Sequence, residues 1–225
     1  MSLSYPQLPL HIGLRDNATF ANFYPGRNAE LLYLLEQGNE PFVYIWGPPG
    51  SGKTHLLQAA CQRVGSAAVY LPLDELKATS PEIFEGLEQM RLIAIEGLEC
   101  IAGDNAWEIG LFHLYNRVRE HGGEMLVAAE GSPTALGVVL PDLLSRLTWG
   151  PVFRIQSLDD EEKAAALQMR AGARGIHMPQ EVAQYLVRHA QRDLHSLFNL
   201  LDTLDEASLA AQRRLTIPFV RQLLG

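Results

Sequence analysis

Residues 47–54 read Gly47-Pro48-Pro49-Gly50-Ser51-Gly52-Lys53-Thr54, and they fill every fixed position of the pattern G-x-x-x-x-G-K-[ST]. An apolar run, FVYIW at 42–46, precedes this loop, and a helical pattern at 53–64 follows it. Glycines in such a loop let successive backbone N–H groups converge on phosphate oxygens, and the helix N-terminus adds its positive end. The context therefore favours a phosphate-binding P-loop over an ordinary Gly/Pro turn before a helix. The residues expected to contact a nucleotide here are Pro49, Gly50, Ser51, Gly52, Lys53, Thr54 and His55, with Lys53 on the β- and γ-phosphates and Thr54 on Mg²⁺.

Short apolar, β-rich runs alternate with helical patterns over the first two thirds of the chain. This alternation predicts an α/β fold with a parallel sheet and helices on both of its faces. The expected strands are 42–46, 67–71, 91–95, 125–129 and 152–155, and the expected helices are 28–37, 53–64, 81–89 and 106–120.

No strand-like run follows residue 156, and the last part of the chain is expected to be helical. The segment Ser157-Leu158-Asp159-Asp160 is interpreted as a capping box that opens the first of these helices. The helices are expected from there to about Arg174, at 180–190, from Asp193 to about 212, and after Pro218. We therefore predict an N-terminal tail at 1–19, a nucleotide-binding α/β domain at 20–156 and a small all-helical domain at 157–225.

The composition excludes several classes of protein. The 225 residues carry a formal net charge of −8, which duplex DNA repels on average, so we expect a protein partner and little direct nucleic-acid binding. No apolar run approaches the roughly 18–20 residues that a membrane span needs, and the N-terminus lacks the features of a signal peptide. Cys61 and Cys100 are the only cysteines, and with no export signal they are expected to be reduced thiols of a cytoplasmic protein.

A P-loop ATPase also needs a carboxylate at the end of a neighbouring strand. The run RLIAI at 91–95 is followed by Glu96-Gly97-Leu98-Glu99. Glu96 is placed to hold the Mg²⁺ shell, and the alternative is that it merely ends a strand. Gly97 occupies the position where an active hydrolase carries a second acid. We therefore expect an ATPase-type P-loop protein with weak or no hydrolysis of its own.

Several further segments narrow the class of P-loop protein. They are TFANFYPGRN at 19–28, ECIAGD at 99–104, LLSRLTWG at 143–150, DLHSL at 193–197 and LTIPFV at 215–220. Together with the P-loop and the trailing helices, they resemble the DnaA-related AAA+ proteins, and among these the Hda family, over nearly the whole chain. The resemblance implies an AAA+ nucleotide-binding domain followed by a helical lid, with ADP or ATP and Mg²⁺ as the bound groups.

The resemblance also assigns roles to residues around the phosphates. The segment at 19–28 implies that Phe23, Tyr24 and Asn28 line the base pocket. Glu130 stands at the sensor 1 position and His195 at the sensor 2 position, where DnaA-like proteins carry aspartate and arginine. A histidine binds phosphate less well than arginine, because arginine stays charged and binds bidentately. The alternative for His195 is a surface or core histidine.

Arg146 corresponds to the family's arginine finger, which acts on a nucleotide held by a neighbour. The segment 141–147 is expected to form a short helix that buries Leu143, Leu144 and Leu147, so that Arg146 projects away from the buried side. The alternative is an arginine in a salt bridge on a helix. Glu96 replaces the family's usual aspartate, and His195 replaces its arginine. The resemblance therefore implies nucleotide binding, but it does not imply that the chain hydrolyses its own nucleotide.

Residues 7–12, QLPLHI, resemble the short motif with which Hda-like proteins bind the sliding clamp of DNA polymerase, its beta subunit. An extended tail of this kind places a glutamine in a small pocket and aliphatic side chains in an apolar groove. The resemblance implies clamp contacts by Gln7, Leu8, Leu10 and Ile12.

Two functions from different classes follow. The first is a regulator of replication initiation that binds the sliding clamp and stimulates ATP hydrolysis by DnaA through Arg146, which inactivates DnaA. The second is a self-sufficient AAA+ ATPase of the clamp-loader or helicase-loader type, against which Gly97 and His195 speak. Both leave self-association open.

Overall fold

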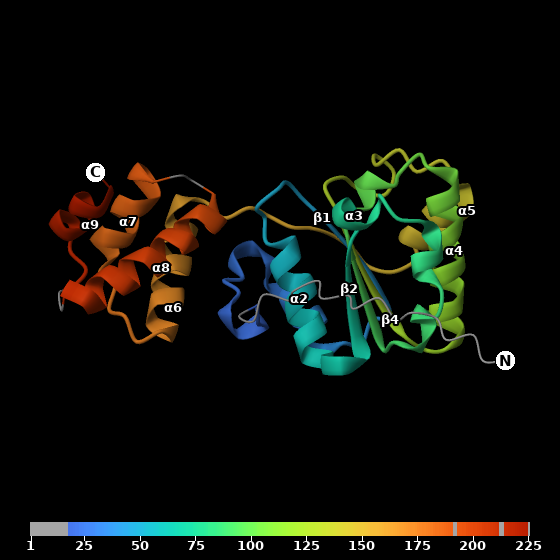
Figure 1. The fold of residues 1–225 in the computed structure, drawn as a ribbon, viewed down its shortest axis with the longest axis horizontal. Coiled ribbons are helices and arrows are strands. Elements are labelled where there is room, and N and C mark those ends of the chain that lie inside the picture. The colour runs from blue at the N-terminus through green and yellow to red at the C-terminus, as the bar shows by residue number, and fades with distance from the viewer. Residues whose placement is uncertain (1–17, 191–192, 212–213, 225) are drawn as a thin grey trace.

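The computed structural model describes residues 18–190, 193–211 and 214–224, which form an α/β unit followed by a bundle of helices (Figure 1). The strands are β1 (Phe42–Trp46), β2 (Ala68–Pro72), β3 (Leu92–Glu96), β4 (Glu124–Ala129) and β5 (Val152–Arg154). They lie in the order β2-β3-β4-β1-β5, and every neighbouring pair is parallel. The predicted parallel sheet is confirmed, and each expected strand bound lies within one residue of the observed one.

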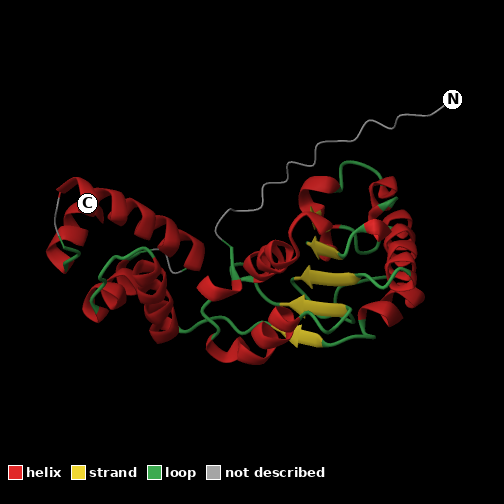
Figure 2. Ribbon diagram, turned by 90° about the horizontal axis from the view of Figure 1, so that it is seen from below, coloured by secondary structure: helices red, strands yellow, loops and turns green. Residues whose placement is uncertain are grey.

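Helices cover both faces of the sheet, which explains why its strands are apolar on both sides (Figure 2). One face carries α1 (Ala29–Gln37) and α2 (Lys53–Val64), and the other carries α3 (Leu73–Leu76), α4 (Asn105–Glu120) and α5 (Pro141–Leu147). Alternate residues of one strand enter different cores: Ala94 packs in the core under α1 and α2, whereas Ile93 and Ile95 pack in the core under α4 and α5.

The C-terminal helices have a core of their own. They are α6 (Asp160–Ala173), α7 (Gln180–His189), α8 (Leu194–Ala211) and α9 (Ile217–Leu224). Leu167, Leu186 and Leu201 lie fully buried among them, in a cluster that contains no residue of the sheet. Figure 1 shows this bundle at the opposite end of the molecule from α4 and α5. Within the described residues, none of the helices is both long and apolar enough to cross a membrane.

Two local expectations were wrong. The helix predicted at 81–89 is instead two 3-10 turns, Pro81–Phe84 and Leu87–Gln89, because Glu85 is extended and Gly86 adopts a left-handed φ of +78° between them. The capping box of α6 begins at Asp159, not at Ser157. The Asp159 carboxylate accepts a hydrogen bond from the Glu162 backbone at 2.9 Å, and Glu162 reciprocates at 2.9 Å. Only this pair offers the glutamate at the third position that the motif requires.

A buried carboxylate fixes the loop that leads into α5. Glu108, in the first turns of α4, has no exposed surface. Its oxygens accept hydrogen bonds from the backbone N–H groups of Gly103 at 2.7 Å, Val139 at 3.0 Å and Leu140 at 2.7 Å. Because Leu140 directly precedes α5, one side chain holds two loops together and sets where that helix begins.

Glu108→Ala is expected to lower the free energy of unfolding by about 3 kcal/mol or more, because each backbone donor left without an acceptor costs about 1–3 kcal/mol. Glu108→Gln keeps one acceptor oxygen and should lose less. Urea denaturation followed by circular dichroism measures both. Glu120→Ala, at the exposed end of the same helix, is the control and should change stability by less than about 0.5 kcal/mol. A loss below about 1 kcal/mol for Glu108→Ala would mean that other contacts hold the loop.

Candidate nucleotide-binding site

The P-loop has the backbone shape that its glycines allow. Gly50 and Gly52 adopt left-handed φ angles of +73° and +100°, and α2 begins at Lys53 directly after them. The Lys53 ammonium is folded back onto the loop, where it donates to the carbonyl oxygens of Gly47 at 2.7 Å and Pro48 at 3.0 Å. The buried Oγ of Ser51 has no hydrogen-bond partner among the described residues. The Ser51 hydroxyl has no described partner, and the Lys53 ammonium is paired with carbonyl oxygens and not with an anion. Both groups are therefore available to bind phosphate oxygens, as expected of a P-loop.

The residues predicted for Mg²⁺ meet at the carboxyl end of the sheet. The Thr54 hydroxyl, from the first turn of α2, donates to Oε1 of Glu96 at 2.5 Å. Glu96 ends β3, as predicted. A hydroxyl and one carboxylate are a donor set that suits Mg²⁺, which keeps several waters and takes its other ligands from phosphates. The oxygens present therefore fit that ion.

Tyr70 is a site residue that the sequence analysis missed. Its hydroxyl donates to Oε2 of Glu96, so that each of the two carboxylate oxygens accepts one hydrogen bond, from Thr54 and from Tyr70. Burial, and then the bond to Glu96, raises the pKa of the Tyr70 phenol well above its usual value. The phenol, already protonated at neutral pH, therefore stays a donor into the alkaline range. In the parallel register Tyr70 lies opposite Ala94, two residues before Glu96, so the pair is diagonal on one face of the sheet.

Three carboxylates surround the lysine of the loop. Burial lowers the pKa of Lys53, and the charges of Glu96, Glu99 and Glu130 act in the opposite direction. Glu99 is brought there by the turn after β3, where Gly97 has a φ of +79° and residues Leu98–Cys100 form a 3-10 turn. Its carboxylate accepts a hydrogen bond from the Glu130 backbone at 3.1 Å. The structure thus places Glu130 beside Glu99 and the P-loop, at the end of β4.

The predicted base-pocket segment lies against the P-loop. The ring of Phe23 approaches Gly52 so closely that a Cβ there would come within 2.8 Å of it. Phe23 also packs against the ring of His55, with centroids 5.4 Å apart. The Nε2 of His55 lies 2.8 Å from the carbonyl oxygen of Thr19. Tyr24, the next residue after Phe23, is half-buried. An aromatic side chain therefore lies next to the phosphate loop, where a base could stack.

Asn28 is buried and has a partner in the chain. Its side-chain NH₂ donates to the Gln156 carbonyl at 3.0 Å, and its side-chain oxygen accepts from the Gln156 N–H at 2.7 Å. The neighbouring Arg27 donates to the carbonyl of Ser157 at 2.8 Å and lies 3.6 Å from the Glu162 carboxylate. This corner joins the predicted base-pocket segment to the residues that lead into α6.

Arg146 lies away from the P-loop, in the last turn of α5 on the other face of the sheet. Its helix spans the predicted residues, with Leu143 and Leu147 buried as expected, whereas Leu144, also expected to be buried, is half-buried. Arg146 was expected to project away from the buried side of this helix. Its side chain is half-buried, and its guanidinium carbon lies 5.0 Å from the centre of the Trp149 ring and 5.9 Å from that of the Phe112 ring. No described acid pairs with it, which removes the salt-bridge alternative for the described part of the chain.

The remaining predicted site residues lie wholly or partly outside the described part of the structure. His195 is the second residue of α8, and its side chain lies outside the described part of the structure. The predicted clamp motif lies at 7–12, also outside the described residues.

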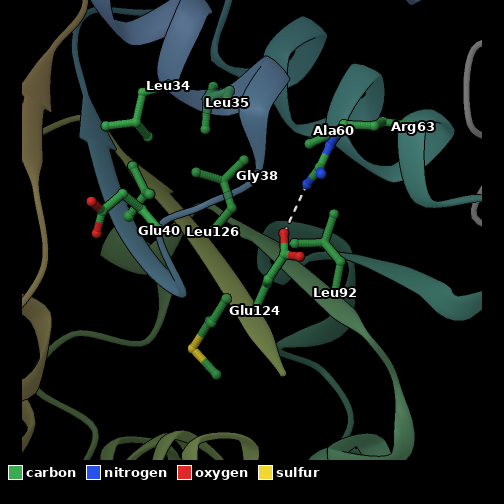
Figure 3. Close-up of a pocket in the computed structure, with 11 residues that line it drawn as sticks. Leu34, Leu35, Gly38, Glu40, Ala60, Arg63, Leu92, Glu124 and Leu126 are labelled. Atoms are coloured by element: carbon green, nitrogen blue, oxygen red, sulfur yellow. Dashed lines mark hydrogen bonds and ion pairs between the residues drawn. The ribbon is translucent and has the colours of Figure 1, made fainter. Parts of the chain in front are cut away.

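The pocket drawn in Figure 3 lies at the opposite, amino end of the strands and contains none of the residues predicted for nucleotide. The Arg63 guanidinium crosses it to Glu124 at 2.7 Å. A Cβ on Gly38 would overlap that guanidinium, so the glycine that ends α1 also makes room for the ion pair. This pocket is a structural feature of the α1–α2 corner.

Tyr70→Phe is expected to weaken Mg²⁺-dependent binding of ADP by about tenfold and to leave binding in EDTA unchanged, because one hydrogen bond to a charged acceptor contributes about 1.5–3 kcal/mol. Calorimetry with and without Mg²⁺ measures both affinities. Tyr115→Phe is the matched control, since the buried Tyr115 hydroxyl has no hydrogen-bond partner among the described residues. Lys53→Ala should lose binding under both conditions. An equal loss in EDTA for Tyr70→Phe would show that Tyr70 shapes the loop and does not act through Glu96.

Comparison with known proteins relates the C-terminal helices to a family and nearly the whole chain to a fold. Residues 160–224 match the family model described as the Hda lid domain. Domain III of the Thermotoga maritima replication initiation protein DnaA is similar over 93% of this chain and 96% of that one, with a TM-score of 0.73 and 20% identity. AMPPCP-bound DnaA from Aquifex aeolicus is similar over 86% of this chain, with a TM-score of 0.72 and 21% identity.

A third structure, the replication initiator DnaA bound to AMPPCP and single-stranded DNA, is similar over 86% of this chain, with a TM-score of 0.71 and 22% identity. This chain spans 66% of the length of that DnaA chain and 66% of the Aquifex aeolicus one. At these identities the likeness shows the fold, which is the AAA+ fold of DnaA. The chain thus has a DnaA-like AAA+ fold, and its residues 160–224, from α6 to α9, match the Hda lid domain.

Proposed function

We propose that this chain is a nucleotide-binding regulator of replication initiation that binds the sliding clamp and stimulates ATP hydrolysis by DnaA. The observation that carries the proposal is the convergence of Lys53, Thr54 and Glu96 at one edge of a DnaA-like sheet that is followed by an Hda-type lid. Two of the DnaA structures that share this fold were solved with AMPPCP, a nucleotide analogue, which supports the same ligand class here.

In this proposal the P-loop binds ADP or ATP. Lys53 leaves the carbonyls of Gly47 and Pro48 and places its charge on the phosphates, and the orphaned Ser51 hydroxyl gains a partner. Thr54 and Glu96 hold Mg²⁺, which neutralises phosphate charge when it is bound. On the other side of the loop, Phe23 and Tyr24 contact the base.

The chain hydrolyses its own nucleotide weakly or not at all. The position after Glu96 is Gly97, so no second acid stands where one would polarise the attacking water. Glu99 is the one observation that favours the second candidate, a self-sufficient AAA+ ATPase, because the turn after β3 brings its carboxylate near Lys53. Comparing ATP turnover by this chain alone with turnover after addition of DnaA and DNA-loaded clamp separates the two functions.

The action on DnaA is assigned to Arg146. An arginine supplied by a neighbour stabilises the charge that develops on a phosphoryl group during transfer, an effect of about 10³–10⁵ in rate in other systems. Arg146 lies on the face of the sheet opposite α2, away from the chain's own P-loop, and has no carboxylate partner among the described residues. Its charge is therefore available to another subunit.

Arg146→Ala is expected to leave nucleotide binding and clamp binding unchanged and to remove most of the stimulation of ATP hydrolysis by DnaA. Arg146→Lys should restore little of the stimulation, because the single charge of an ammonium does not replace the planar guanidinium, which binds two phosphoryl oxygens at once. The measurement is the rate at which ATP-DnaA becomes ADP-DnaA in the presence of DNA-loaded clamp. Conversion at the normal rate by the alanine variant would exclude an in-trans arginine at this position.

The combined variant Gln7→Ala, Leu8→Ala and Leu10→Ala is expected to lose clamp binding and keep nucleotide affinity. Peptide motifs of this kind bind as extended segments, so their loss leaves a folded domain intact. Surface-immobilised clamp measures the binding. The matched control is Ser2→Ala with Ser4→Ala, outside the motif, which should bind as the wild type does. Clamp binding that survives the triple substitution would place the contact elsewhere in the chain.

A further inference from the structure

The ring of Trp149 is the meeting point of two arginines. Trp149 follows α5 and leaves 53% of its surface exposed. The guanidinium carbon of Arg119, near the end of α4, lies over this ring at 4.2 Å from its centroid, and that of Arg146 lies at 5.0 Å. Both helices pack on the same face of the sheet, as Figure 1 shows. We call these three side chains the arginine–tryptophan cluster.

The two arginines of the cluster are not neutralised by the described part of the chain. None of the ion pairs found there includes Arg119 or Arg146, and the buried Nε of Arg146 has no hydrogen-bond partner there. By contrast, Arg63 and Arg117 each pair with a glutamate. Two guanidiniums that share one ring, with no described acid paired to either, are unexpected in a chain of net charge −8, because like charges held near each other repel.

An anion that contacts both guanidiniums would turn this repulsion into attraction. The indole attracts each cation through its ring face but does not cancel the charge, so the full charge of both arginines stays available. A carboxylate has one charge and two oxygens, which satisfy one guanidinium fork. A phosphate chain has several oxygens and at least two charges, and it can engage two forks together. The cluster therefore fits polyphosphate better than an acidic side chain.

We infer that Arg119 and Arg146 form one binding site for the phosphate chain of a nucleotide held by another protein subunit, with Trp149 keeping both side chains in place. This rests on the proposed role of Arg146, and it adds Arg119 as a second cation and Trp149 as a positioning residue. The chain's own nucleotide is not the ligand, because the P-loop leads into α2 on the opposite face of the sheet.

The test measures ATP hydrolysis by DnaA with DNA-loaded clamp and variants of the full chain at several salt concentrations. Arg119→Ala is expected to lower the stimulated rate by about tenfold or more, because a charge-assisted contact to the transferring phosphate is lost. It should also flatten the salt dependence of that rate. Arg119 is exposed, so its loss leaves the fold intact. Arg188→Ala, which removes an exposed arginine from α7, is the matched control and should keep the wild-type rate.

Two further variants test how the cluster works. Trp149→Phe retains an aromatic face and should retain most of the rate, whereas Trp149→Ala should lose about as much as Arg119→Ala. In the Arg146→Ala background, Arg119→Ala should add little, because groups that act as one unit lose their effect together. Thermal unfolding of each variant, compared with that of the wild type, shows whether a lost rate comes from a lost fold.

The possible results separate the inference from the function on which it rests. A full rate with Arg146→Ala would overturn the proposed function itself. A strong loss with Arg146→Ala beside a wild-type rate with Arg119→Ala would overturn only the two-arginine site. Equal losses of rate for Arg119→Ala and Arg188→Ala would show that net charge alone matters. That result would also overturn the two-arginine site. A full rate with Trp149→Ala would remove Trp149 from the site.

Discussion

The parallel pairing of β4 with both β1 and β3 brings their carboxyl ends to one edge of the sheet. Trp46 pairs with Ala129, and Glu96 pairs with Ala128. The pairing continues past the strands, because the Gly47 N–H donates to the Ala129 carbonyl at 3.2 Å and the Gly97 N–H to that of Ala128 at 3.1 Å. The first residue of the P-loop and the turn after Glu96 are thus hydrogen-bonded to the same strand. These backbone hydrogen bonds to β4 position the P-loop and the end of β3 side by side. They thereby bring Lys53, Thr54 and Glu96 together.

Features that depend on neighbours in the sequence could be predicted, and features that depend on register could not. The P-loop, the strands and α5 follow from local patterns and lie where the sequence indicates. Tyr70 meets Glu96 only through the diagonal of two paired strands, and the sequence does not state that pairing. A signal was present in hindsight, since Tyr70 carries a hydroxyl in the middle of an otherwise apolar strand. The partners of Glu108 at Val139 and Leu140 lie more than thirty residues along the chain, in a loop without a pattern.

The segment before α1 has a second structural role beside its predicted one. The resemblance to DnaA-like proteins assigns it to the base pocket, and Phe23 does lie against the phosphate loop. The paired hydrogen bonds between Asn28 and Gln156 also tie it to the linker that enters the lid. The sequence could not predict this contact, because a buried carboxamide and its backbone partner 128 residues away produce no recognisable pattern along the chain. The same short segment therefore borders both the phosphate loop and the linker between sheet and lid.

The left-handed turn at Gly97 has an evolutionary consequence. A φ of +79° is open to glycine, but it costs a residue with a side chain on the order of 1–2 kcal/mol. A mutation that put glutamate at this position would therefore strain the turn that carries Glu99 toward the P-loop, and it would add a further carboxylate to the three already near Lys53. Gaining an acid at this position would therefore require the turn to be rebuilt as well. Once such a glycine is fixed, single substitutions to an acid pass only through less stable intermediates.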